Sequence, residues 1–118
     1  MGQIKGSNVG QLNRLIAVGK LLPLDEKLKY PAGFFRWLEH PQNKLLFARF
    51  SLQAHQMAER RPRYSARTIV EVLRWNTDMI RDSSVTFKIQ NNMVPGMARL
   101  WMLENGWRYP GFFQLRDM

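Results

Sequence analysis

The most cationic part of the chain is the run Arg60-Arg61-Pro62-Arg63-Tyr64, in which three arginines and a tyrosine fall within five residues. A guanidinium group matches a phosphate through paired hydrogen bonds, and a tyrosine ring can stack on a nucleobase. The same run also suits a charged helix C-terminus, where cations interact favourably with the helix dipole. Both interpretations stay open from the sequence.

A second set of polar residues leads into this run along a predicted helix. Arg49, Gln53, Gln56 and Arg60 recur at steps of 4, 3 and 4, which places them on one helical face. This stripe is long enough to lie along a partner, although an ordinary solvated face would have the same pattern.

A third set lies around residues 88–99, where Lys88, Asn91, Asn92 and Arg99 precede or enter an apolar helix. Asparagine can recognise adenine, and lysine or arginine can bind phosphate or guanine. In a helix-turn-helix reader, the first turn of the second helix contacts base edges. The body of this helix is too apolar to read bases, so we expect a buried strut whose first turn alone reaches a partner.

The residue types needed for most catalysis and for metal binding are scarce. The chain has no cysteine and only two histidines, His40 and His55, which lie 15 residues apart and form no metal-ligand pattern. No glycine-rich phosphate loop or nucleophile-elbow motif is present. We therefore expect a binding protein rather than an enzyme, with no metal and no cofactor.

The net charge of +9 favours a polyanionic partner, with nucleic acid first, an anionic membrane second and an acidic protein third. Residues 1–64 hold 11 lysines and arginines against 4 acidic residues, whereas residues 65–118 hold 7 against 5. The basic surplus thus precedes the apolar helix. No apolar run is long enough to span a membrane, and we expect a cytoplasmic protein.

The spacing of apolar residues along the chain predicts a mainly α fold. We expect a compact bundle of four to five helices with one short extended or hairpin segment near 85–90, and a helix-turn-helix-like arrangement stays open. Residues 1–30 are predicted as an N-terminal extension or short helix, and 31–118 as a single helical domain. The predicted helices cover 9–22, 31–40, 43–60, 66–80 and about 92–105, with Ser65 and Asn91 or Asn92 as N-caps and Gly106 as a C-cap.

Several motifs in order resemble a family of small proteins found in bacteria, phages and prophages. They are an aromatic helix with Trp37, the run Tyr64-Ser65-Ala66-Arg67-Thr68-Ile69-Val70-Glu71-Val72-Leu73-Arg74-Trp75, the run Phe87-Lys88-Ile89-Gln90-Asn91-Asn92, then Pro95, Ala98-Arg99-Leu100 and Pro110-Gly111-Phe112-Phe113-Gln114-Leu115-Arg116. The chain departs from that family at Met93, where a tyrosine is usual. The resemblance covers about two thirds of the chain and implies a phage or mobile-element setting, and so host cytoplasm, without implying a defined activity.

Two functions follow as hypotheses. The favoured one is nucleic-acid binding through the arginine-rich surface. The alternative is a phage inhibitor that binds and disables a host protein complex, such as a recombination nuclease or a defence complex. Aromatic and methionine side chains are enriched at protein interfaces, and the candidates for such a patch are Met93, Met97, Trp101, Trp107 and Phe112.

Overall fold

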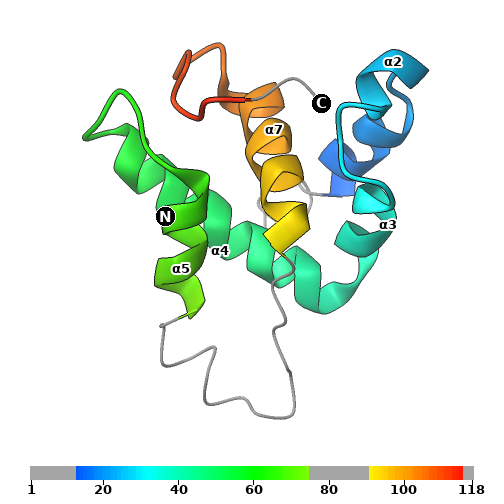
Figure 1. The fold of residues 1–118 in the computed structure, drawn as a ribbon, viewed down its shortest axis with the longest axis horizontal. Helices are drawn as coiled ribbons and strands as arrows, with labels where there is room; N and C mark the ends of the chain where they lie inside the picture. Colours follow the sequence, from blue (N-terminus) through cyan, green and yellow to red (C-terminus); the bar gives the residue numbers. More distant parts are fainter. Residues whose placement is uncertain (1–12, 75–90, 116–118) are drawn as a thin grey trace.

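The computed structural model describes residues 13–74 and 91–115, and within these ranges it contains helices and turns but no strand. Residues 13–20 are helical, and α2 (Leu24–Lys27), α3 (Phe34–Glu39), α4 (Pro41–Ala58), α5 (Ala66–Arg74), η1 (Asn91–Met93) and α7 (Val94–Asn105) follow (Figure 1). The prediction of a mainly α bundle is confirmed. The predicted extended segment at 85–90 lies outside the described residues.

The helix α4 is the longest of the described elements, and its apolar face was predicted correctly. Leu46, Phe50 and Ala54 are buried, as the steps of 4 require, and Met57 packs against the core at the same face. The predicted bounds were two residues late at each end. Pro41 does stop α3, but it also occupies the first helical turn of α4, where a missing N–H costs nothing.

The preceding aromatic helix is shorter than expected. The prediction placed Pro31 in its first turn, but α3 begins only at Phe34. Gly33 caps it with a left-handed φ of +73°, a conformation that glycine adopts without strain.

Ser65 caps α5 as predicted. Its Oγ accepts a hydrogen bond from the Thr68 backbone N–H at 3.2 Å, which satisfies one of the free amides of the first turn. Ile69, Val70 and Leu73 then face the core. The predicted extension of this helix to residue 80 lies beyond the described part.

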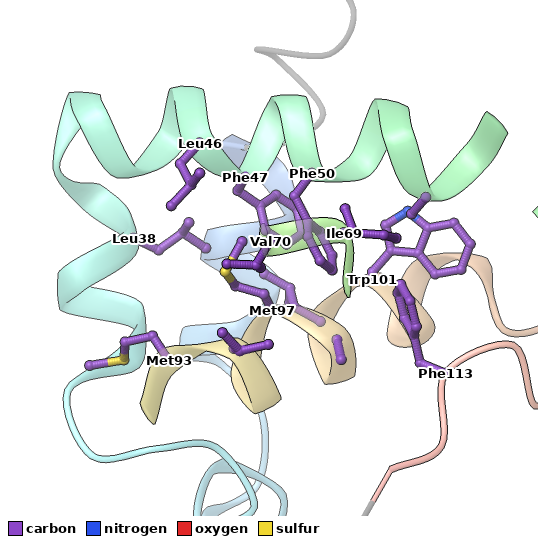
Figure 2. Close-up of a cluster of buried hydrophobic side chains, with 14 of the residues drawn as sticks. Leu38, Leu46, Phe47, Phe50, Ile69, Val70, Met93, Met97, Trp101 and Phe113 are labelled. Atoms are coloured by element: carbon purple, nitrogen blue, oxygen red, sulfur yellow. The ribbon is translucent and has the colours of Figure 1, made fainter. Parts of the chain in front are cut away.

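The helix α7 occupies the centre of the fold, between α5 on one side and α3 on the other (Figure 1). Its buried residues are Val94, Gly96, Met97, Ala98, Leu100 and Trp101. In Figure 2, Met97 and Trp101 point toward the side chains of α4, with Ile69 and Val70 between the two helices. The expectation of a buried strut is therefore confirmed.

The start of α7 differs from the prediction. Neither asparagine caps it, because Asn91–Met93 form a 3-10 turn and the N-cap position is Met93, with no side-chain capping bond. Pro95 does lie in the first turn, and Gly106 is the C-cap, although with an ordinary helical φ of −63°.

Two glycines allow aromatic rings to approach helix backbones. A Cβ atom added at Gly96 of α7 would lie 2.5 Å from Cδ1 of Phe34, and one at Gly19 would lie 2.2 Å from Cε1 of Phe35. The sequence indicated only that Gly19 weakens its helix. In the structure this glycine lets the 13–20 helix, with buried Leu15 and Ile16, close against α3.

Candidate binding surface

Arg60, Arg61 and Arg63, hereafter the arginine cluster, lie on the loop that joins α4 to α5. All three side chains are exposed, and no carboxylate within the described ranges forms an ion pair with them. Pro62 keeps the loop from continuing α4, because it lacks an N–H and its ring clashes with a preceding helical turn. The cluster therefore presents three guanidinium groups on a short loop.

Hydrogen bonds at both ends hold this loop in place. The backbone N–H groups of Arg60 and Arg61 both donate to the Met57 carbonyl, at 3.0 and 2.8 Å. At the other end, Tyr64 is half-buried and its backbone N–H donates to the Phe112 carbonyl at 3.0 Å. The Arg61 guanidinium lies 6.0 Å from the centre of the Tyr64 ring. An arginine and the tyrosine of this run therefore lie close together in the folded loop.

The loop meets a second turn, Trp107-Arg108-Tyr109, hereafter the aromatic turn. The Tyr109 hydroxyl donates to the Glu59 carboxylate, and Arg108 Nη2 lies 3.9 Å from the same oxygen, Oε2. The bond to Glu59 raises the pKa of Tyr109, because it stabilises the protonated phenol. Glu59 precedes the arginine cluster directly, so the aromatic turn engages the carboxylate closest in sequence to the cluster.

Arg108 is a cation that the sequence reasoning did not include in the site. Its guanidinium carbon lies 5.3 Å from the centre of the Tyr109 ring, and its side chain is largely exposed. The available signal was composition, because residues 107–109 repeat the mixture of arginine and aromatic residues found at 60–64. Nothing local indicated that the two segments would meet.

The predicted stripe on α4 is only partly at the surface. Gln56 and Arg60 are exposed, whereas Arg49 and Gln53 are half-buried. The Nε atom of Arg49 is buried and has no hydrogen-bond partner in the described part of the chain. The stripe therefore joins the arginine cluster at its Arg60 end and recedes toward the core at its Arg49 end.

The two described side chains of the third predicted set, Asn92 and Arg99, do not lie at this surface. Arg99 is half-buried and lies close enough to Tyr30 for its charge to act on that phenol. Burial raises the pKa of Tyr30 to about 12, and the positive charge of Arg99 opposes that shift. Asn92 is exposed, but it precedes α7, whereas the aromatic turn follows it. A helix of this length separates the two by about 18 Å. The Asn91 side chain and Lys88 lie outside the described residues.

The histidine of α4, His55, packs against aromatic side chains. His55 is half-buried, and its ring meets Trp101 edge-on at 5.1 Å and Tyr109 at 6.3 Å. Burial lowers the pKa of His55, Arg108 lowers it further, and Glu59 acts in the opposite direction. Within residues 13–74 and 91–115, no three histidine, aspartate or glutamate side chains gather as a metal ion would require.

Comparison of the chain with protein-family models, curated proteins and solved structures gives no significant match. The family resemblance drawn from the motifs therefore stays a prediction. None of the described helices is both long and apolar enough to cross a membrane.

Proposed function

We propose that the protein binds nucleic acid through a basic surface formed by the arginine cluster and the aromatic turn. The observation that carries this proposal is the distribution of charge around Glu59. The cluster's three guanidinium groups are exposed without carboxylate partners among the described residues, while Glu59 is engaged by Arg108 and Tyr109. Guanidinium groups held in this way attract phosphate oxygens and can bind them in a bidentate manner.

The fold favours nucleic-acid contacts made from a loop rather than from a recognition helix. Half of the residues of α7 are buried in the core, and its exposed residues include Pro95 and Leu103, which cannot read base edges. The arginine cluster lies instead on a loop that is hydrogen-bonded at both ends, so less conformational entropy is lost when a phosphate is bound. The net charge of +9 adds long-range attraction to the same kind of partner.

A titration at two salt concentrations tests the proposal. Duplex and single-stranded DNA would be titrated with the protein at about 50 and 200 mM salt, because binding to phosphates must weaken steeply as salt rises. Replacing Arg60, Arg61 and Arg63 with alanine should reduce affinity at low salt. It should also make the negative slope of log K against log salt shallower by about 2 for a single strand, since each lost contact contributes ~0.7 to its magnitude.

A matched control removes the same charge elsewhere. Lys20, Lys27 and Arg36 are exposed. Lys20 pairs with Glu39 of α3, and α2 and α3, which carry Lys27 and Arg36, lie across the molecule from the cluster (Figure 1). Their replacement with alanine should change affinity much less than the cluster variant does. Equal losses would mean that overall charge, rather than this surface, binds the partner. Undetectable binding of both DNA forms at low salt would contradict the proposal.

One observation favours the alternative, an inhibitor that binds a host protein complex. Val18, Leu21, Leu24 and Leu28 are exposed at one end of the molecule, and Leu21 is 84% exposed. Exposed apolar side chains grouped along one segment are typical of protein-binding surfaces. Of the interface patch suggested by the sequence, only Trp107 is exposed. The other four members, Met93, Met97, Trp101 and Phe112, are buried. Replacing Leu24 and Leu28 with glutamine should abolish capture of a partner from a bacterial host lysate, and unchanged capture would count against this alternative.

A further inference from the structure

We infer that the basic surface takes single-stranded nucleic acid, with Trp107 as a platform on which a base stacks. This inference rests on the proposed function and adds to it the form of the nucleic acid. Trp107 is 81% exposed, whereas Trp101 is 1% exposed and Trp37 is partly buried against the core. Trp107 also takes part in no ring contact with the described part of the protein.

The backbone on both sides of Trp107 is fixed although its side chain is free. The Gly106 N–H donates to the Met102 carbonyl at 2.8 Å, and the N–H groups of Arg108 and Tyr109 donate to the Asn105 carbonyl at 3.0 and 2.9 Å. A fixed backbone with an exposed ring limits the entropy lost when a base stacks on that ring.

The residue after Trp107 belongs to a stack that reaches the core. Arg108 lies over the Tyr109 ring at 5.3 Å, and Tyr109 stacks on Trp101 with ring centres 6.0 Å apart and planes inclined by 22°. The aromatic turn is thereby anchored on Trp101, a fully buried residue of α7. Trp107 is held outside this stack and next to the arginine of the turn.

The arginine cluster supplies phosphate contacts near the platform. Glu59 contacts both Arg108 and Tyr109 and directly precedes Arg60, so the cluster and the aromatic turn lie against the same end of α4. Single-strand binders combine a basic track for the backbone with aromatic rings for the bases, because every base has a stacking face. In a duplex the bases are already stacked on one another, so an exposed indole finds no free base face there on which to stack.

The test uses oligonucleotides that distinguish binding to the bases from binding to the phosphates. Binding of the full chain would be measured by fluorescence anisotropy with a mixed-sequence DNA strand of about 15 nucleotides, its duplex, an RNA strand of the same sequence, and an abasic DNA strand of the same length. Trp107→Ala should weaken binding of the base-bearing strands by roughly 5- to 150-fold. It should leave the abasic strand, the duplex and the salt slope unchanged. Trp107→Phe should restore most of the loss, because a phenyl ring can still stack.

Each further outcome distinguishes the two proposals. If Trp107→Ala binds the base-bearing strands as well as wild type does, while the arginine-cluster variant still loses affinity, base stacking on Trp107 is wrong. Nucleic-acid binding by the basic surface is then still supported. Tighter binding of the duplex than of either strand also overturns the single-strand inference alone. Binding of none of the four probes at low salt overturns the proposed function and this inference with it. The DNA and RNA strands together show which sugar the surface accepts. A circular dichroism melt of each variant confirms that it is folded.

Discussion

The backbone N–H of Tyr64 donates to the carbonyl oxygen of Phe112 at 3.0 Å, and this bond joins two segments that are far apart in the sequence. Tyr64 ends the loop that carries the arginine cluster, and Phe112 follows the aromatic turn. Phe112 is itself buried against Trp101, with ring centres 5.4 Å apart. The candidate binding surface is therefore anchored on the core of the fold.

Trp101→Ala should lower the free energy of unfolding by about 3–5 kcal/mol, because it removes a fully buried aromatic side chain and leaves a cavity. The indole contacts His55, Tyr109, Phe112 and Phe113. Urea denaturation gives the difference directly. Trp107→Ala is the matched control and should stay within ~0.5 kcal/mol of wild type, since exposed substitutions rarely cost more. Wild-type stability of Trp101→Ala would contradict the central position assigned to this residue.

Gly96→Ala should destabilise the fold by about 1–3 kcal/mol through overpacking. The new methyl group would lie 2.5 Å from Cδ1 of Phe34 and 2.7 Å from its Cε1, and Phe34 is fully buried, so the ring has little room to move. Intrinsic helix propensity alone would predict the opposite sign, because alanine is the better helix former. Thermal or urea unfolding therefore separates close packing from propensity.

A double-mutant cycle identifies the cause of that loss. Phe34→Leu removes the ring that the methyl group meets, so the double variant Gly96→Ala/Phe34→Leu should be more stable than the sum of the single effects predicts. Strict additivity would show that the Gly96 effect does not arise from Phe34.

The sequence predicted those parts of the fold that depend on local pattern. The buried face of α4, the Ser65 cap and the apolar body of α7 all follow from residues within a few turns of one another. The predicted cap of α7, Asn91 or Asn92, was wrong. The helix begins at Val94, and the N-cap position falls on Met93, which is buried in the core. The meeting of Arg108 with Glu59 links residues about 50 positions apart, and no local rule indicates such a contact.

Ser65→Ala should cost about 1 kcal/mol of stability, the usual loss when an N-cap hydroxyl is removed. The Thr68 N–H would lose the acceptor that now lies 3.2 Å away. Ser65→Asp should keep most of the stability, because a carboxylate accepts the same bond and favours the positive end of the helix dipole. If the aspartate variant is as unstable as the alanine variant, the cap does not contribute through this hydrogen bond.

Stability should fall as the pH drops below the ordinary His55 pKa of 6.5. Burial of this ring against Trp101, with Arg108 nearby, lowers its pKa in the folded protein, and Glu59 only partly offsets that shift. The unfolded chain therefore binds a proton that the folded chain does not, so unfolding becomes easier from about pH 6.5 downward. Above that value the histidine is neutral in both states and contributes no slope. Urea unfolding at several pH values should show a steeper loss below 6.5 for wild type than for His55→Gln, which cannot titrate. Parallel curves for the two proteins would show that other groups, rather than His55, govern stability in this range.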